Sequence, residues 1–364
     1  MGTRRSLLLY PFSILYRLVT DIRNLLYNTG ILPSVKFDVP VICIGNITVG
    51  GTGKTPHAEY LIDLLRKHFK VALLSRGYKR RSKGFRIVSR SSSVSEIGDE
   101  PLQIFLKFPE IHVAVDRDRA NGIKTIMKEH PETDAIILDD GFQHRRVKPG
   151  LSILLIDYDR PITRDYLMPY GNLREKRNNR KRADIIVVSK TPETVSALAM
   201  EEINKELQLN YKQKLFFTSI SYKDLVPVFE NSASERPGLA KQNRENHGAV
   251  LVTGIAASGS LETFLEKYFE EIIHFDFPDH HYFNENDIEK IRAAWKDLTS
   301  QEKILITTEK DAVRLREFTN IDDSLKRFFY YIPVRISFLK DDKHEFDNMI
   351  FEYVRKNKRN NRIP

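Results

Sequence analysis

The chain has 364 residues, 41% of them apolar and 29% charged, with a formal net charge of +9 and one cysteine, Cys43. At about 100 to 200 residues per domain this length predicts two domains, and the composition excludes a disordered chain, a polytopic membrane protein and an internal disulfide. The positive charge predicts an acidic partner, but no zinc finger or aromatic-interleaved RNA motif accompanies the basic clusters, so we predict no nucleic-acid partner.

Residues 13–28 form the first predicted element, an amphipathic helix. Its apolar residues recur at helical spacing, whereas Arg17 and Asp21 lie on the other side. These charges exclude a transmembrane helix, which needs about 20 mostly apolar residues. The preceding residues 7–12 are apolar and aromatic, as is typical of an interfacial anchor on anionic lipid. Residues 1–28 are therefore predicted to dock on a membrane surface, and packing of the helix on its own domain is the alternative.

Short apolar runs alternate with helical stretches between residues 29 and 215. Continuous apolar character predicts strands buried on both faces, and the intervening helices predict a parallel, doubly wound sheet. The predicted strands are 41–44, 71–74, 111–115, 135–138, 153–156 and 184–188.

A glycine-rich loop follows the first of these strands and leads into a predicted helix from His57. Glycines let backbone N–H groups turn toward phosphates, Lys54 would neutralise the β- and γ-phosphates, and the Thr55 hydroxyl would bind Mg²⁺. The predicted triphosphate-binding residues are Thr48, Val49, Gly50, Gly51, Thr52, Gly53, Lys54 and Thr55. Thr48 stands where the usual phosphate-loop pattern has glycine. The strand–loop–helix context still predicts a P-loop NTPase-like α/β core over 29–215.

The predicted strand at 135–138 ends in two adjacent carboxylates, Asp139 and Asp140. In phosphate-loop sites an acid at the end of a buried strand holds the metal, and Mg²⁺ prefers oxygen ligands. Taken alone, an apolar run ending in two aspartates is more often a strand that leaves the core. Together with the glycine loop, the two carboxylates predict direct or water-mediated ligands for Mg²⁺.

A second, smaller α/β domain is predicted over 225–327, with a polar linker at 231–247. Its predicted elements are strands at 249–253 and 304–307, a helix from Leu261 and a helix over 311–317. The β-rich runs 215–221 and 328–339 predict a two-stranded connection between the domains. A final helix within 340–364 could return to the first domain.

Several short motifs then occur in order along the chain. They are Gly45-Asn46-x-Thr48-x-Gly50-Gly51-Thr52-Gly53-Lys54-Thr55-Pro56, Ser75-Arg76-Gly77-Tyr78, Gly98-Asp99-Glu100-Pro101, Asp139-Asp140-Gly141-Phe142-Gln143-His144-Arg145, Leu173-Arg174-Glu175, Phe277-x-Asp279-His280 and Thr307-Thr308-Glu309-Lys310-Asp311-Ala312. Any one motif is weak evidence, but the ordered set is highly specific. Together the motifs closely resemble the tetraacyldisaccharide 4'-kinase family, the lipid A 4'-kinases of Gram-negative bacteria, up to about residue 315.

The resemblance implies ATP-dependent phosphorylation of the 4'-hydroxyl of tetraacyl disaccharide 1-phosphate, which gives lipid IVA in lipid A biosynthesis. It implies ATP and Mg²⁺ as cofactors, a lipid substrate at an anionic membrane surface, and a peripheral location on the cytoplasmic face of the inner membrane. No protein partner is implied. The rival function is a membrane-associated P-loop ATPase switch, whose loop has a lysine directly before the paired glycines; Val49 at that position weighs against it.

The same resemblance implies that Asp99 is the base that accepts the hydroxyl proton, with His280 as its dyad partner. From the residues alone, Asp99 could instead cap a helix and His280 could be an ordinary surface or core histidine. Which of the two takes the proton stays open. Because His280 lies in the second domain, we expect the site to form only when the domains close on each other.

The remaining site residues follow from the motifs as well. Candidate metal ligands are Thr55, Glu100, Asp139 and Asp140. Candidate substrate-binding residues are Arg76, Tyr78, Arg174 and Glu175. For Arg76, pairing with a carboxylate in the core is the alternative.

Overall fold

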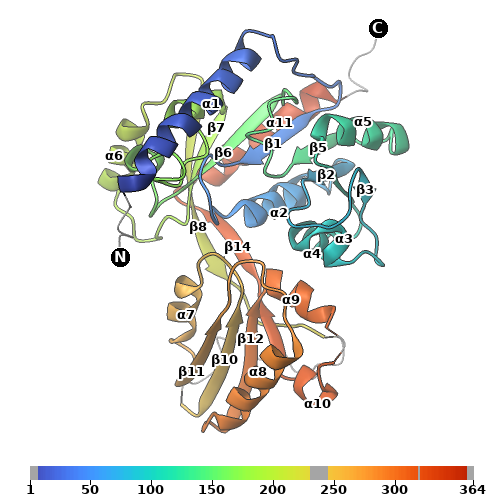
Figure 1. The fold of residues 1–364 in the computed structure, drawn as a ribbon, viewed down its shortest axis with the longest axis vertical. Coiled ribbons are helices and arrows are strands. Elements are labelled where there is room, and N and C mark those ends of the chain that lie inside the picture. The colour runs from blue at the N-terminus through green and yellow to red at the C-terminus, as the bar shows by residue number, and fades with distance from the viewer. Residues whose placement is uncertain (1–6, 230–244, 319, 359–364) are drawn as a thin grey trace.

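The protein is described by a computed structural model over residues 7–229, 245–318 and 320–358. Most of the predicted linker at 231–247 and both ends of the chain lie outside these residues. A larger and a smaller lobe are joined by long strands that run between them (Figure 1). The larger lobe contains a nine-stranded sheet and the smaller lobe a five-stranded sheet.

The larger sheet has the strand order β14-β8-β7-β6-β1-β5-β2-β4-β3. Its strands are β1 (Val41–Gly45), β2 (Val71–Ser75), β3 (Arg86–Ile87), β4 (His112–Val115), β5 (Ala135–Leu138), β6 (Leu151–Asp157), β7 (Ile185–Ser189), β8 (Lys214–Tyr222) and β14 (Val334–Phe338). Strands from β8 to β4 pair in parallel, and only the edge strands β3 and β14 are antiparallel. The predicted mostly parallel α/β fold class is therefore confirmed.

Helices cover both faces of this sheet, which explains the continuous apolar runs of its central strands. The helices are α2 (Lys54–Leu65), α3 (Val94–Ile97), α4 (Asp99–Lys107), α5 (Arg119–Glu129), α6 (Ala197–Leu207) and α11 (Asp342–Asn357). Apolar residues of α2, α4 and α11 share one core cluster, while those of α5 belong to the cluster on the other face. Helix α11 is also tied to β1, because the Tyr353 hydroxyl donates to the Val41 carbonyl at 3.2 Å.

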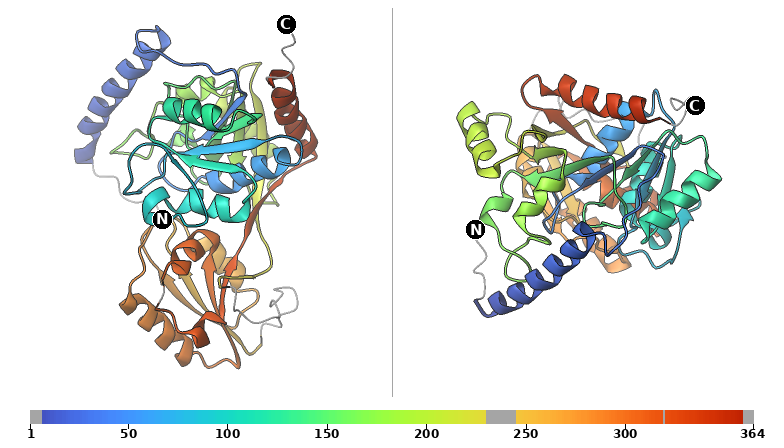
Figure 2. Two further views of the ribbon diagram at one scale, coloured as in Figure 1. Left: turned by 90° about the vertical axis from the view of Figure 1, so that its right-hand side faces the viewer. Right: turned by 90° about the horizontal axis from the view of Figure 1, so that it is seen from above.

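The smaller sheet has the order β11-β10-β12-β13-β9, with β9 antiparallel at its edge. Its elements are β9 (Val226–Pro227), β10 (His247–Thr253), α7 (Gly259–Leu265), β11 (Glu271–Asp276), α8 (Glu285–Asp297), β12 (Glu302–Thr308), α9 (Glu309–Arg316), α10 (Asp323–Lys326) and β13 (Phe329–Ile332). The chain passes from β8 into β9 and returns from β13 into β14, so the same two segments serve both sheets (Figure 2).

The two lobes also meet where α9 of the smaller lobe packs against α4 of the larger lobe. Val313 of α9 belongs to the same core cluster as α2 and α4. Beside it, the Lys107 ammonium lies 2.6 Å from Glu59 of α2 and 2.8 Å from Glu309 of α9. Burial and the charge of Glu309 raise the pKa of Glu59 to about 7. This contact brings the first turn of α4 against the small lobe.

Helix α1 (Tyr10–Asn28), preceded by the short 3₁₀ turn Leu7–Leu9, lies along the outside of the larger lobe (Figures 1 and 2). Its polar side contacts the lobe: the Ser13 hydroxyl donates to the Leu167 carbonyl and the Tyr16 hydroxyl to the Arg174 carbonyl, both at 3.0 Å. No helix within the described residues is both long and apolar enough to cross a membrane.

Candidate active site

The glycine loop connects β1 to α2 and is held in shape by backbone contacts. Gly50 and Gly53 have φ angles of +94° and +74°, a region in which residues with a side chain are strained. Thr48 is different, because its backbone bridges Leu173 in an extended conformation. Next to it, the Val49 N–H donates to the Asn172 carbonyl at 2.8 Å. The position that departs from the usual loop pattern thus needs no glycine.

Buried side chains fix the same loop from below. The Asn46 amide donates to the Thr52 hydroxyl at 2.8 Å, and the Ser189 hydroxyl donates to the Thr52 carbonyl at 2.9 Å. His57 lies 2.7 Å from the Gly53 carbonyl, and burial lowers its pKa to about 4. These groups shape the loop without adding a charge of their own.

Asp139 and Asp140 leave the carboxyl end of β5 beside Lys54. Asp140 has φ +47°, uncommon for a residue other than glycine, and its carboxylate lies 3.7 Å from the Lys54 ammonium and 3.4 Å from Arg174. Burial and the charges of Glu100 and Asp140 raise the pKa of Asp139 to about 7. Burial alone would raise the pKa of Asp140, but Lys54 and Arg174 hold it below its usual range.

These two carboxylates fit a magnesium ion. Within the described residues, the buried Oδ1 atoms of both Asp139 and Asp140 lack a hydrogen-bond donor, although the Lys54 ammonium lies 3.7 Å from Asp140 Oδ1. An orphaned buried carboxylate oxygen needs a cation or a water, and oxygen is the ligand Mg²⁺ prefers. Thr55, at the start of α2, adds a hydroxyl on the side of the phosphate loop.

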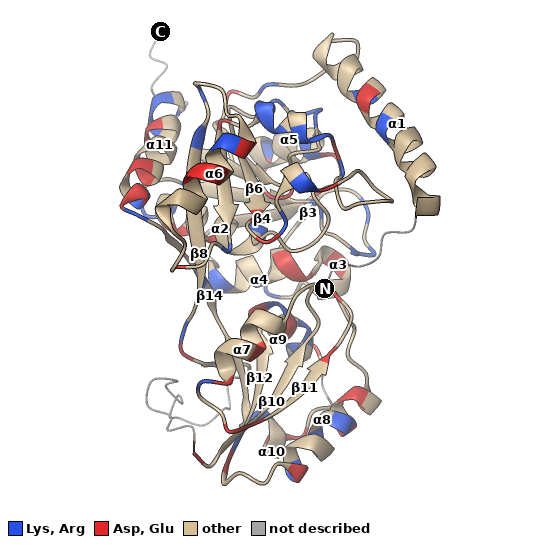
Figure 3. Ribbon diagram, turned by 90° about the vertical axis from the view of Figure 1, so that its left-hand side faces the viewer, with Lys and Arg blue, Asp and Glu red and all other residues tan. Residues whose placement is uncertain are grey.

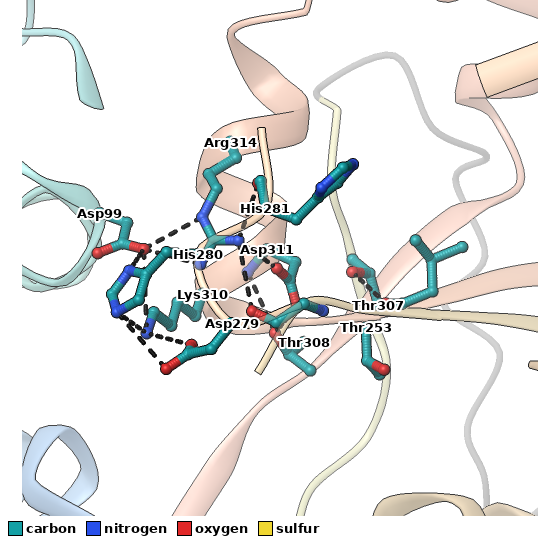
Figure 4. Close-up of polar contacts among 12 residues, drawn as sticks. Asp99, Thr253, Asp279, His280, His281, Thr307, Thr308, Lys310, Asp311 and Arg314 are labelled. Atoms are coloured by element: carbon teal, nitrogen blue, oxygen red, sulfur yellow. Dashed lines mark hydrogen bonds and ion pairs between the residues drawn. The ribbon is translucent and has the colours of Figure 1, made fainter. Parts of the chain in front are cut away.

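Asp99 and His280 meet across the contact between the lobes (Figure 4). Asp99 is the first residue of α4, and His280 lies in the loop between β11 and α8 with φ +61°. The His280 Nδ1 atom is 2.7 Å from Asp99 Oδ2. Tyr78 is 54% exposed, and the centroid of its ring lies 5.0 Å from that of the His280 imidazole. The sequence-predicted dyad is thus within hydrogen-bonding distance.

Arg314 of α9 braces the Asp99 carboxylate from the second lobe. Its Nε and Nη2 atoms donate to Asp99 Oδ2 at 3.1 and 2.7 Å, and its Nη1 donates to Asp311 at 2.8 Å. Both side chains of the Asp99–Arg314 pair are at most 5% exposed. Burial alone would raise the pKa of Asp99, but the His280 hydrogen bond and the charges of Lys310 and Arg314 hold it well below its usual range. The carboxylate therefore remains ionised throughout the neutral range.

Lys310, one helical turn before Arg314, fixes the tautomer of the histidine. Its ammonium nitrogen lies 3.2 Å from His280 Nε2, 3.2 Å from Asp279 and 3.4 Å from Glu100. An ammonium group can only donate, so His280 Nε2 accepts this bond. The ring proton is then on Nδ1, which donates to Asp99.

A cavity of about 660 Å³ lies between the lobes, within the size range of small-molecule sites. It is bordered by Gly51, Gly53 and Thr55 of the phosphate loop and by Lys310 of the small lobe. Its apolar lining includes Tyr222, Ile255, Leu261 and Val334. The cavity thus connects the phosphate loop with the neighbourhood of His280.

The substrate-binding candidates differ in their placement. Arg174 contacts Asp140 and Tyr78 contacts His280, so both border the site. Arg76 is exposed rather than buried in the core. Glu175 is only 2% exposed, and its Oε2 atom accepts bonds from Asn179 and Arg182 at 2.8 and 2.6 Å. Its carboxylate orders the loop that carries Arg174.

Three cationic residues of the site had no role assigned from the sequence. Arg119 of α5 is buried, and its Nη2 atom lies 3.5 Å from the Asp140 carbonyl. Lys310 stands inside a recognised motif, and Arg314 follows it four residues later. That spacing places the two on one face of a helix and is a signal that sequence reasoning could have used.

Comparisons with known proteins find relatives over nearly the whole chain. The model of a family described as tetraacyldisaccharide-1-P 4'-kinase matches residues 5–355. Curated relatives named tetraacyldisaccharide 4'-kinase include one from Phocaeicola vulgatus, 47% identical over 97% of this chain and 96% of the relative. Another, from Bacteroides thetaiotaomicron, is 44% identical over 97% of this chain and 94% of the relative. Among solved structures, the "apo" form of LpxK from Aquifex aeolicus in complex with ATP is 29% identical, with a TM-score of 0.70 and coverage of 95% of this chain and 98% of that one.

Replacing Asp99 with asparagine should remove one of the two buried carboxylates that Arg314 contacts and leave its charge only partly compensated. We therefore expect Asp99→Asn to lower the free energy of unfolding at neutral pH by about 3 kcal/mol. Because the pKa of Asp99 is lower in the folded state, this contribution is complete above about pH 4 and is lost as the pH falls through the folded-state value. Urea denaturation at about pH 7, 5 and 3 measures it.

The matched control is Asp323→Asn, whose side chain is 81% exposed and should change the free energy of unfolding by less than about 0.5 kcal/mol. The free energy of unfolding of Asp99→Asn should lie below that of wild type by a constant amount between pH 7 and 5, and by a smaller amount at pH 3. A difference that grows as the pH falls would contradict the assignment of the buried ion pair.

Proposed function

The chain belongs to the tetraacyldisaccharide 4'-kinase family, and we propose that it transfers the γ-phosphoryl group of ATP to the 4'-hydroxyl of tetraacyl disaccharide 1-phosphate at the site between its lobes. The product is lipid IVA of lipid A biosynthesis. One observation carries this assignment of the site: Lys310 borders the cavity of the phosphate loop and also contacts His280 of the Asp99–His280 pair. Donor and acceptor chemistry therefore adjoin each other.

The larger lobe binds the triphosphate. Backbone N–H groups of the glycine loop and the Lys54 ammonium hold the β- and γ-phosphates at the start of α2, where the helix dipole favours negative charge. The apolar end of the cavity, formed by Tyr222, Ile255 and Val334, suits a nucleoside base. Thr55, Asp139, Asp140 and Glu100 would hold Mg²⁺, which supplies charge neutralisation at the phosphates when bound.

The Asp99–His280 pair serves the acceptor. Phosphoryl transfer requires that the hydroxyl loses its proton as the new P–O bond forms. Asp99 stays ionised and orients the imidazole through Nδ1. The lone pair of Nε2 accepts from Lys310 in this structure and becomes available to the hydroxyl proton once the ammonium turns away. The proton is accepted by the pair as a unit. Tyr78 and Arg174 flank the acceptor side, and we assign them to the sugar and its phosphate.

Phosphorylation of the lipid itself tests this function. Purified protein is incubated with ATP, Mg²⁺ and tetraacyl disaccharide 1-phosphate in detergent micelles, and phosphate on the 4'-position is measured by mass spectrometry. We expect Asp99→Asn to reduce turnover by about 10² to 10⁴-fold while nucleotide affinity is kept. Lys54→Ala should weaken nucleotide affinity as well, and exposed Lys128→Ala on α5 should match wild type.

A rival ATPase switch gives a different result in the same assay. Release of free phosphate only, or stimulation of hydrolysis by DNA, contradicts the kinase function. Equal loss of nucleotide affinity in Asp99→Asn and Lys54→Ala would remove Asp99 from the acceptor side. Thermal melts of each variant establish that it is folded at the assay temperature.

We also propose that α1 docks on an anionic membrane surface at the cytoplasmic face of the inner membrane. An ordinary surface helix buries its apolar side, but α1 buries its polar side: Ser13, Thr20 and Asn24 are buried against the lobe. Leu15 and Leu18 on the other side are 61% and 56% exposed. Figure 3 shows this helix with few charged residues along the outside of the larger lobe. A contiguous exposed apolar face of this kind marks an interaction surface.

Liposome flotation tests the docking of α1. Replacing Leu15 and Leu18 together with aspartate should reduce the fraction of protein bound to anionic vesicles at least tenfold, because two apolar anchors of about 2 kcal/mol each are lost. The matched control is Leu198→Asp, an equally exposed leucine (65%) on α6. Unchanged flotation of the α1 double variant would make that face something other than a membrane anchor.

A further inference from the structure

The Thr307-Thr308-Glu309-Lys310-Asp311-Ala312 motif lies at the start of α9, and none of its residues has so far been assigned to the transferred phosphoryl group. Thr308 caps the helix, because its hydroxyl accepts from the Asp311 N–H at 3.1 Å. Asp311 in turn accepts the Gly254 N–H at 2.9 Å and holds Arg314 at 2.8 Å. These contacts fix the first turn of α9 rigidly within the smaller lobe. Lys310 projects from this fixed turn toward the larger lobe (Figure 4).

We propose that Lys310 is a catalytic residue that the smaller lobe contributes, and that its ammonium group stabilises negative charge on the γ-phosphoryl group during transfer. This inference rests on the proposed function. In the transfer step, the bond between the γ-phosphorus and the bridging oxygen of ADP breaks and a bond to the 4'-oxygen forms. The hydroxyl proton goes to the Asp99–His280 pair, and ADP leaves with the bridging oxygen. Charge on the transferred oxygens is the quantity that a nearby cation stabilises.

The position of Lys310 suits this role, because it belongs to both halves of the site. It borders the cavity that Gly51, Gly53 and Thr55 line from the phosphate loop, on the opposite lobe from Lys54. It also contacts His280 of the acceptor side at 3.2 Å. Its side chain is 16% exposed, so solvent screens its charge only weakly. A phosphoryl group that moves from the loop toward His280 therefore approaches the Lys310 ammonium.

The contacts of Lys310 differ from those of Arg314 in a way that separates their roles. Arg314 makes charge-assisted bonds of 2.7 and 2.8 Å to Asp99 and Asp311, which is the usual length of such bonds. Lys310 lies 3.2 Å from Asp279, 3.4 Å from Glu100 and 3.9 Å from Asp99. Each of these distances is longer than an optimal bond, so the ammonium is committed to no single carboxylate. Arg314 is a brace, whereas Lys310 can turn to an arriving phosphate.

The surrounding carboxylates show why a cation is needed there. Asp99, Glu100 and Asp279 all lie within 3.9 Å of the Lys310 ammonium. A triphosphate that approaches these carboxylates without an intervening cation meets like charge, which opposes its approach. Lys310 therefore supplies the charge that lets the phosphoryl group approach Asp99 and His280.

The test separates binding of the ground state from binding of the transition state. We expect Lys310→Met to lower kcat for lipid phosphorylation about 10³-fold, as removal of a cation from a phosphoryl-transfer site does. The affinity for ATP with Mg²⁺ should change by less than about threefold, whereas the affinity for ADP with aluminium fluoride, a mimic of the transferred group, should fall in parallel with kcat. Lys310→Arg keeps the charge and should recover at least tenfold of the lost turnover.

Lys303→Met, in the preceding strand β12 of the same lobe, is the matched control and should leave all three quantities unchanged. The inference is overturned if wild type phosphorylates the lipid and Lys310→Met turns over within threefold of it. It is likewise overturned if Lys310→Met loses ATP and ADP–aluminium fluoride affinity equally. If wild-type protein places no phosphate on the lipid, the proposed function fails, and the role of Lys310 fails with it.

Discussion

The contact between α4 and α9 is the constraint on which the site depends. Asp99 is the first residue of α4 in the larger lobe, and His280 and Arg314 belong to the smaller lobe, so the Asp99–His280 pair exists only where the lobes touch. The buried Glu59–Lys107–Glu309 ion group strengthens the same contact. Each ion group takes partners from both lobes, so removing one partner while the lobes stay joined would leave a buried charge uncompensated, which is costly. The same contact places the Asp99–His280 pair beside the cavity that the phosphate loop borders.

Much of this architecture follows from local sequence. The central strands are buried on both faces, so their sequences are continuous apolar runs. The phosphate loop is recognisable because glycines stand at its positions of positive φ. Contacts between distant residues do not show in this way. Arg314 reaches Asp99 across 215 positions, and no periodicity in either segment indicates it. Glu175 lies in a motif that suggests ligand binding, but its carboxylate is buried and paired with Arg182. A carboxylate is buried only where a partner compensates its charge, and local sequence does not reveal that partner.

Helix α1 shows a second limit of the same kind. Its sequence predicts an apolar and a polar side. The apolar side would be buried in either interpretation, against a membrane in one and against the protein's own domain in the other. Only the fold determines which side the protein itself covers. Here the polar side contacts the larger lobe, so Leu15, Leu18 and Ile22 are left exposed on the outside. Because the Tyr16 hydroxyl donates to the Arg174 carbonyl, the helix is also tied to the loop that borders the site.

The central claim is that Asp99 and His280 act as one unit formed across the lobes. A double-mutant cycle on kcat for lipid phosphorylation, with Asp99→Asn, His280→Asn and the double variant, tests it most directly. Residues that act as a unit lose activity non-additively. The account predicts that the double variant is about as slow as the slower single variant. Losses that multiply, so that the double variant is slower by the product of the two single effects, would contradict it.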